Sequence, residues 1–305
     1  MQQLLILSGK GGTGKTTIAG AFIRLADAKA YADCDVDAPN LHLVTEWKTE
    51  PKKTNYYGLP KAKINPELCI RCDQCRQNCR FDAVLADEIY KVNPFACEGC
   101  GVCKFICPAQ AITMIPSVDG ELNLYSDAGK VFSTAQLKMG SGTSGLLVTE
   151  VKKQMKSAAV DADLAIIDGS PGIGCPVIAS LSGADMVLVV AEPSVSGISD
   201  MERIIDTAAK FGIKTAVCIN KYDINIENTK NIEDFCKKQG LPLVGSIPYD
   251  PDAVKAVNNG QTIADIDCKS GKAVKEVYHK TMNLLFAEIS KNTEENCNDE
   301  NCCSK

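Results

Sequence analysis

The stretch that decides the fold is LLILSGKGGTGKTT at residues 4–17, an apolar run followed by a glycine-rich loop. Residues 9–16 match G-x-x-x-x-G-K-[ST], a pattern whose backbone N–H groups curl around phosphate oxygens at the start of a helix. Leu4–Leu7 reads as a buried strand, and Gly14–Asp27 as the helix after it. In this context the motif predicts a nucleoside triphosphate site, rather than a turn that only links strand to helix.

The chemistry of the loop assigns its residues. Lys15 should reach the β- and γ-phosphates, and the Thr16 hydroxyl should bind Mg²⁺. The other residues of this segment expected to bind the nucleotide are Gly11, Gly12, Thr13, Gly14 and Thr17.

Outward from the loop, short apolar runs alternate with helix-period segments. This pattern predicts an α/β fold, a P-loop NTPase with a mostly parallel sheet and helices on both faces. Further strands are expected at Tyr31–Asp35, Leu164–Asp168, Met186–Ala191, Thr215–Asn220 and Leu243–Ser246. Helices are expected at Leu146–Ser157, Asp200–Phe211 (behind a capping box of Ser199 and Glu202), Ile226–Gln239 and Lys272–Ser290.

A cysteine-rich segment interrupts this alternation of expected strands and helices. The chain has 16 cysteines, and eight lie between residues 69 and 107. Two runs share C-x₂-C-x₂-C-x₃-C spacing: Cys69, Cys72, Cys75 and Cys79, then Cys97, Cys100, Cys103 and Cys107. In a reducing compartment such spacing indicates metal rather than disulfides. Zinc is the main rival, but zinc sites favour paired C-x₂-C knuckles over runs of four.

The two runs resemble a bacterial two-cluster ferredoxin, in which the fourth cysteine of each run ligates the other cluster. The resemblance implies two [4Fe–4S] clusters. One would be held by Cys69, Cys72, Cys75 and Cys107, and the second by Cys97, Cys100, Cys103 and Cys79. Arg80 stands where a proline usually follows the first run, which removes no ligand.

Lys10, directly after the first glycine of the loop, marks a deviant form of the phosphate loop. Here the chain resembles the MinD/ParA/Mrp family of ATPases, which includes the nitrogenase iron protein. In that family the extra lysine crosses a dimer interface and contacts the nucleotide of the other subunit. The resemblance implies a nucleotide-dependent dimer, homo- or heterodimeric, that hydrolyses ATP with Mg²⁺.

Two acidic segments match the switches of that family. Asp33-Cys34-Asp35-Val36-Asp37 resembles the first switch, where Asp35 would order the attacking water or the Mg²⁺ shell, with Asp37 nearby. Asp168-Gly169-Ser170-Pro171-Gly172 resembles the second. There Asp168 would hold the Mg²⁺ water shell and the Gly172 backbone would sense the γ-phosphate. Taken singly, Asp35 or Asp37 reads as a solvated turn carboxylate, but acids at the carboxyl ends of strands face the crevice where ligands bind, which weakens that interpretation. The expected catalytic residues are Lys10, Lys15, Asp35 and Asp168.

Two further segments are expected beside the nucleotide base. Asn220 begins an Asn-Lys-Tyr-Asp run that also resembles the guanine-selecting signature of GTPases, so ATP is favoured by the family while GTP stays open. The base loop of the family is matched by Pro248, Tyr249 and Asp250.

Seven of the eight remaining cysteines divide into three kinds. Cys175 follows the second switch, where the nitrogenase iron protein has a ligand of a cluster shared between subunits; a buried packing residue is the equal alternative. Packing is expected for Cys34, Cys218 and Cys236. A flexible polar tail carries Cys297, Cys302 and Cys303.

These observations predict an ATPase domain at residues 1–56 and 116–290, an inserted ferredoxin-like α+β domain at 57–115, and the tail at 291–305. The expected function is assembly or delivery of an iron–sulfur or related metallocofactor to a client metalloprotein. The alternative is ATP-gated electron transfer to a client redox protein.

Bulk properties weigh against other classes. The net charge is −5, so we expect no nucleic-acid partner. No apolar run approaches the roughly 20 residues that cross a bilayer, and no leader precedes the first strand, so we expect no membrane role and a cytoplasmic location.

Overall fold

The computed structural model describes residues 1–45 and 47–299, with side chains as far as residue 287. Its centre is a nine-stranded sheet in the order β13-β12-β11-β1-β10-β2-β9-β8-β3. The strands from β13 to β9 run parallel, whereas β8 pairs antiparallel with both β9 and β3. Their bounds are β1 Gln2–Leu7, β2 Ala30–Asp33, β3 Lys52–Tyr57, β8 Val118–Asp127, β9 Lys130–Leu137, β10 Leu164–Asp168, β11 Met186–Ala191, β12 Lys214–Asn220 and β13 Leu243–Ile247.

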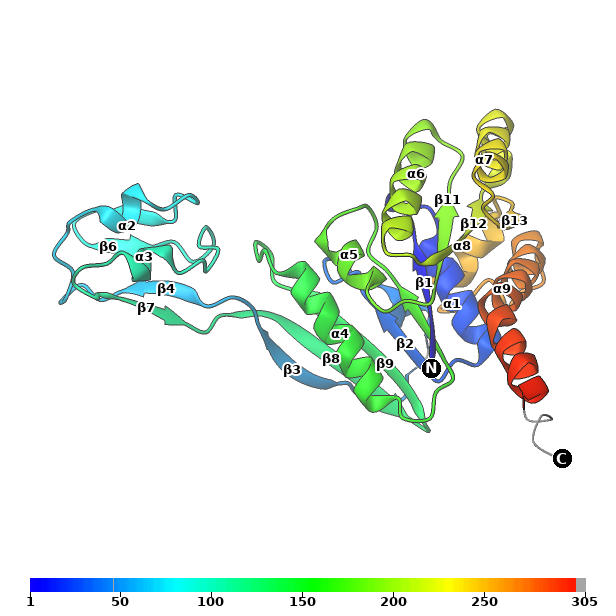
Figure 1. The fold of residues 1–305 in the computed structure, drawn as a ribbon, viewed down its shortest axis with the longest axis horizontal. Helices are drawn as coiled ribbons and strands as arrows, with labels where there is room; N and C mark the ends of the chain where they lie inside the picture. Colours follow the sequence, from blue (N-terminus) through cyan, green and yellow to red (C-terminus); the bar gives the residue numbers. More distant parts are fainter. Residues whose placement is uncertain (46, 300–305) are drawn as a thin grey trace.

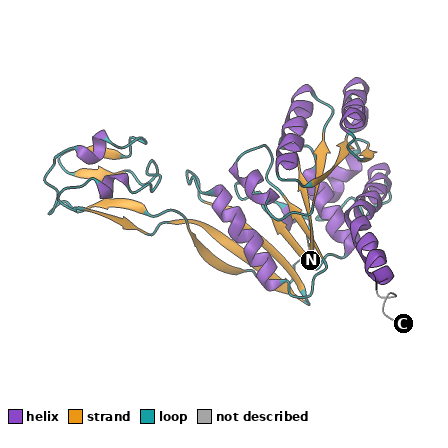
Figure 2. Cartoon of the chain, in the orientation of Figure 1, coloured by secondary structure: helices purple, strands orange, loops and turns teal. Residues whose placement is uncertain are grey.

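Helices cover both faces of the sheet, as Figure 2 shows. One apolar core joins alternate strand residues to α4–α7, and the other joins the intervening residues to α1, α8 and α9. Since side chains alternate across a strand, strands buried on both faces read as continuous apolar runs. The helices are α1 Lys15–Ala26, α4 Ser144–Ala158, α5 Cys175–Leu181, α6 Val195–Lys210, α7 Ile226–Gln239, α8 Pro251–Asn258 and α9 Lys269–Asp299, with 3₁₀ turns η1 Leu41–Leu43 and η2 Tyr222–Ile224.

A small lobe, residues 58–116, projects from one edge of this body (Figure 1). The edge strands β3 and β8 carry the chain out to it and back. The lobe has its own apolar core, into which six of the eight clustered cysteines pack or are buried. Its elements are β4 Lys61–Ile64, α2 Gln74–Gln77, β5 Val84–Ala86, β6 Tyr90–Val92, α3 Val102–Phe105 and β7 Ile112–Ile115.

Most expected elements of the ATPase body are present, with differences of three kinds. Strands β3, β8 and β9 and helices α5 and α8 were not anticipated. The start expected for the helix at Asp200 is wrong: α6 begins at Val195, because the Ser194 hydroxyl accepts a hydrogen bond from the Gly197 N–H at 3.1 Å and caps it five residues earlier. Helix α9 includes residues 291–299, where a tail without regular structure was predicted. Cys302 and Cys303 lie outside the described residues.

Candidate nucleotide site and cysteine lobe

The phosphate loop lies between the end of β1 and the start of α1, as its sequence predicts. Gly12 and Gly14 both adopt positive φ, 80° and 90°, a conformation that side-chain-bearing residues rarely take. A side chain at Gly14 would also lie 2.3 Å from the amide nitrogen of Asn220. Position 14 therefore requires glycine, because its backbone is left-handed and because a side chain there would clash with Asn220.

Lys15, Thr16 and Asp168 meet at the base of this loop. The Lys15 ammonium forms a buried ion pair with Asp168, and the Thr16 hydroxyl donates to the same carboxylate at 2.7 Å. Asp168 is fully buried at the end of β10, beside β1 in the sheet. The expected phosphate-binding lysine, magnesium-binding hydroxyl and magnesium-shell carboxylate are thus one hydrogen-bonded group.

The three aspartates of the first acidic segment, residues 33–37, differ in their burial. Asp33 is fully buried, and its carboxylate accepts the N–H groups of Asp35 at 3.0 Å and of Asn40 and Leu41 at 2.9 Å. Burial and the neighbouring Asp168 raise the pKa of Asp33 to about 7. Burial also raises the pKa of half-buried Asp35, whereas Asp37 is exposed. Sequence reasoning assigned no role to Asp33, although it belongs to the same acidic run.

Lys10 turns back onto its own chain. Its ammonium contacts the Glu192 carboxylate at 2.8 Å and the Ser194 hydroxyl at 3.0 Å. Glu192 also binds Lys221 at 3.1 Å, and Lys221 donates to the Gly12 carbonyl at 2.8 Å. The two ammonium groups lower the pKa of Glu192 against the opposing effect of its burial. Sequence reasoning missed Glu192, because no motif marks an acid whose role is to bind two lysines.

The segments expected at the base do line one cavity of about 190 Å³, together with Gly14 and Thr17. The Asn220 amide donates to the Thr13 carbonyl at 2.7 Å, which fixes the cavity wall to the phosphate loop. Asp223 accepts the Tyr249 N–H at 2.7 Å, so one oxygen of the acid in the GTPase-like signature holds the base loop. Asp250 accepts from the Asp252 and Ser270 N–H groups and caps α8. Pro248 completes this side of the cavity.

The second switch leads directly into α5. The Gly172 N–H donates to the Ser8 carbonyl at 3.0 Å, which ties the switch to the phosphate loop. Cys175 is exposed in the first turn of α5, so the buried-packing interpretation is wrong for it. A side chain at Gly145, in the first turn of α4, would lie 3.3 Å from the Cys175 Cβ. The starts of α4 and α5 are therefore in direct contact. The packing prediction is confirmed for Cys34, Cys218 and Cys236, which are all buried.

The buried ammonium of Lys152 joins the same two helices further along. It donates to the carbonyls of Ser180 and Ser182, at the end of α5, and burial lowers its pKa to about 8. Between pH 8 and 10.5 the unfolded chain binds more protons than the folded one, so this lysine makes the free energy of unfolding rise with pH, by at most about 1.4 kcal/mol per pH unit.

Lys152→Met should remove this rise, so the difference in unfolding free energy between wild type and variant should grow as pH increases through that range. Urea unfolding at several pH values measures it. Lys153→Met is the matched control, because that neighbouring lysine is exposed and forms a surface ion pair with Glu150 at 3.6 Å. Parallel pH profiles for wild type and Lys152→Met would contradict the assignment.

Two small cavities in the lobe are each lined by four cysteines. The first cavity has Cys69, Cys72, Cys75 and Cys107, and the second has Cys79, Cys97, Cys100 and Cys103. The fourth cysteine of each run therefore lies with the first three of the other. Among the described residues, no three His, Cys, Asp or Glu side chains are placed to hold one metal ion together.

The two halves of the lobe repeat each other at an offset of 28 residues. Left-handed backbone recurs at Arg71 and Gly99, at Asp73 and Gly101, and at Asp82 and Gln110. Hydrogen bonds then cross between the halves: the Asn65 N–H donates to the Ala111 carbonyl, and the Asn93 N–H donates to the Ala83 carbonyl, both at 2.7 Å. This reciprocal exchange is what carries each fourth cysteine to the opposite cavity.

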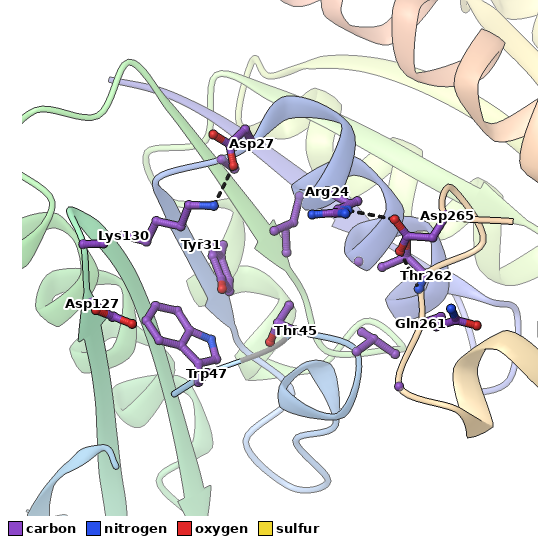
Figure 3. Close-up of a pocket in the computed structure, with 16 residues that line it drawn as sticks. Arg24, Asp27, Tyr31, Thr45, Trp47, Asp127, Lys130, Gln261, Thr262 and Asp265 are labelled. Atoms are coloured by element: carbon purple, nitrogen blue, oxygen red, sulfur yellow. Dashed lines mark hydrogen bonds and ion pairs between the residues drawn. The ribbon is translucent and has the colours of Figure 1, made fainter. Parts of the chain in front are cut away.

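A larger cavity, about 550 Å³, lies away from the phosphate loop, between α1, the β8–β9 turn and the loop before α9 (Figure 3). Four of its charged groups form two ion pairs: Arg24 with Asp265 at 2.7 Å, and Lys130 with Asp27 at 2.5 Å. Tyr31 and Trp47 form its aromatic wall, and burial raises the pKa of Tyr31. None of the residues expected to act on the nucleotide lines it.

The fold and the phosphate loop define a P-loop nucleotide-binding protein. Residues 4–263 match the CobQ/CobB/MinD/ParA nucleotide binding domain, and the chain belongs to this family. It is a MinD/ParA-type ATPase.

Curated relatives and solved structures are similar to this chain over most of its length. It is 33% identical over 288 residues to an uncharacterized protein of Methanocaldococcus jannaschii, covering 93% of this chain and 98% of the relative. An uncharacterized ATP-binding protein of the same organism is 24% identical over 298 residues, covering 95% and 92%. Among solved structures, MinD of Pyrococcus horikoshii complexed with Mg-ADP superposes with a TM-score of 0.56 at 18% identity, covering 93% and 96%. No helix in the described part of the chain is long and apolar enough to cross a membrane.

Proposed function

We propose that this ATPase carries two [4Fe–4S] clusters in an inserted ferredoxin-like domain, residues 57–115, and acts in assembling or delivering an iron–sulfur or related metallocofactor to a client protein. The observation that carries the proposal is the pair of four-cysteine cavities, one in each half of the repeated lobe. The ATPase domain then consists of residues 1–56 and 116–290.

The residues present fit such clusters. Each cavity offers four thiols, and a [4Fe–4S] cluster takes one cysteine on each of four irons, so its ligands need not converge on a single ion. Apolar side chains surround the thiols, among them Ile64 and Ile112 at the first cavity and Val84 and Met114 at the second. When bound, the clusters would supply one-electron redox chemistry or inorganic sulfur and iron.

In the nucleotide cycle, Lys15 would move from Asp168 to the β- and γ-phosphates, and Thr16 would bind Mg²⁺. This exchange leaves Asp168 free to hold the magnesium water shell, while Asp35 orders the attacking water. The Gly172 N–H, which donates to the Ser8 carbonyl in the structure, would leave that carbonyl to sense the γ-phosphate. ATP is the proposed nucleotide, with its base in the cavity lined by Asn220 and the 248–250 loop.

A dimer, of two copies or with a related ATPase, would complete the cycle. Lys10 would leave Glu192 and Ser194 to reach the nucleotide of the other subunit. Glu192 would keep its second ammonium partner, Lys221, so that release of Lys10 does not leave the carboxylate unpaired. The exposed Cys175 would face the same interface and is available to a third cluster shared between subunits.

ATP-gated electron transfer to a client redox protein is the second candidate. It is favoured by the contact between the lobe and the start of α4, described below. In this case the clusters stay bound and only their reduction potential responds to nucleotide.

The test is iron and labile sulfide per chain in protein purified without oxygen, with and without MgATP. About eight of each per chain support two clusters, and about ten support a third one shared across a dimer. Loss of that excess in Cys175→Ser, or on adding MgATP, would favour delivery. Near-zero iron in anaerobic preparations would overturn the cluster proposal.

A further inference from the structure

Two opposite charges lie beside Cys97 in the lobe. Lys61 is buried, and its ammonium donates to the Cys97 carbonyl at 2.6 Å. Glu98 follows Cys97 directly and lines the second cavity. The internal repeat places Ile70 at the corresponding position of the first cavity, so the acid belongs to one half only.

The Glu98 side chain reaches out of the lobe to the ATPase body. A Cβ at Gly142 would lie 2.8 Å from Oε2 of Glu98, so the carboxylate rests on the backbone of the loop before α4. Phe95 approaches the same loop, 3.9 Å from where a Cβ at Gly140 would lie. Figure 1 shows the start of α4 on the side of the body that faces the lobe.

That loop leads into the helix turn that touches the second switch. Gly145 packs on Cys175, and Lys152 ties α4 to the end of α5. The switch itself is hydrogen-bonded to the phosphate loop through Gly172. A continuous set of contacts therefore runs from the phosphate site to the carboxylate beside Cys97.

We propose that Glu98 is a positioning residue that makes the reduction potential of the second cluster depend on the nucleotide state, while Lys61 sets its baseline. The inference rests on the proposed clusters and extends them. Reduction adds one electron from an external one-electron donor to the cluster, and no bond forms. A nearby carboxylate disfavours the added negative charge and a buried ammonium favours it. Movement of the loop before α4 changes the distance of Glu98 from the cluster.

The experiment is a dithionite titration followed by electron paramagnetic resonance, with and without Mg²⁺ and a non-hydrolysable ATP analogue. In the wild-type protein the analogue should shift the midpoint of the second cluster and leave the first unchanged. Cys100→Ala identifies the second cluster, because it removes one of that cluster's ligands alone.

Two variants separate the two charges. Glu98→Gln should make the second midpoint more positive and abolish its response to the analogue. Lys61→Met should make it more negative and keep the response. We expect each variant to shift the midpoint potential of the second cluster by about 59 mV, which is about a tenfold change in the one-electron equilibrium. Glu67→Gln is the control, because this acid is exposed in the first half of the lobe and should change neither quantity.

Gly142→Ala tests the contact without substituting any residue of the lobe. Its methyl group would displace the Glu98 carboxylate and should also change the nucleotide response. A Glu98→Gln protein that keeps the full shift would overturn the proposal. So would a wild-type protein with about eight irons per chain and no shift. Absence of iron would instead overturn the cluster proposal on which this one rests.

Discussion

A Lys15→Ala variant should lose ATP hydrolysis, with kcat falling at least about 100-fold, the usual consequence of removing a charged group that stabilises a transition state. In the nucleotide-free protein the same lysine neutralises Asp168, which is fully buried. Removing it leaves an unpaired buried carboxylate near Asp33, so the variant should also lose about 3–5 kcal/mol of unfolding free energy. Phosphate release and urea unfolding measure the two effects.

A double variant separates chemistry from stability. Lys15→Met with Asp168→Asn removes both buried charges, so the unfolding free energy should recover while hydrolysis stays absent. Hydrolysis within tenfold of wild type in Lys15→Ala would contradict the assigned role. Failure of the double variant to regain stability would show that Asp168 is not the group left unpaired.

The second large effect concerns the crossed cysteines. Cys79→Ala with Cys100→Ala should remove two ligands of one cluster, leaving about four irons per chain. Cys107→Ala with Cys100→Ala should damage both clusters and leave almost no iron. The cavities predict this asymmetry, because Cys107 lies with the first run and Cys79 with the second.

Iron content and absorbance, measured on protein purified without oxygen, distinguish crossed ligation from one cluster per run. If each run instead bound its own cluster, the two double variants would exchange behaviour, since Cys107 and Cys100 belong to one run. Cys268→Ala is the control: this cysteine lies at the start of α9, hydrogen-bonded to the Gly271 N–H, and its loss should leave about eight irons.

Some features of the fold and the candidate site could be predicted from residues that are close together in the sequence. The phosphate loop was predictable because its conformation follows from the glycines, and the flanking strand and helix follow from hydrophobic period. Strands β10 and β11 and helix α7 match their predicted bounds for the same reason. The edge strand β3 and its neighbour β8 were not predicted, because half-exposed strands lack a continuous apolar run.

By itself the sequence determined the P-loop ATPase fold, the phosphate-loop motif and the two cysteine runs, because each depends on neighbours within a few positions. Only the tertiary structure decided that Asp33 is the fully buried acid of its run, that Glu192 binds two lysines, and that Glu98 touches Gly142. It also decided that α6 begins at its Ser194 cap. Glu192 and Glu98 act through contacts between segments distant in sequence. The burial of Asp33 and the choice of cap at Ser194 depend on how the chain packs around them, which hydrophobic period does not specify.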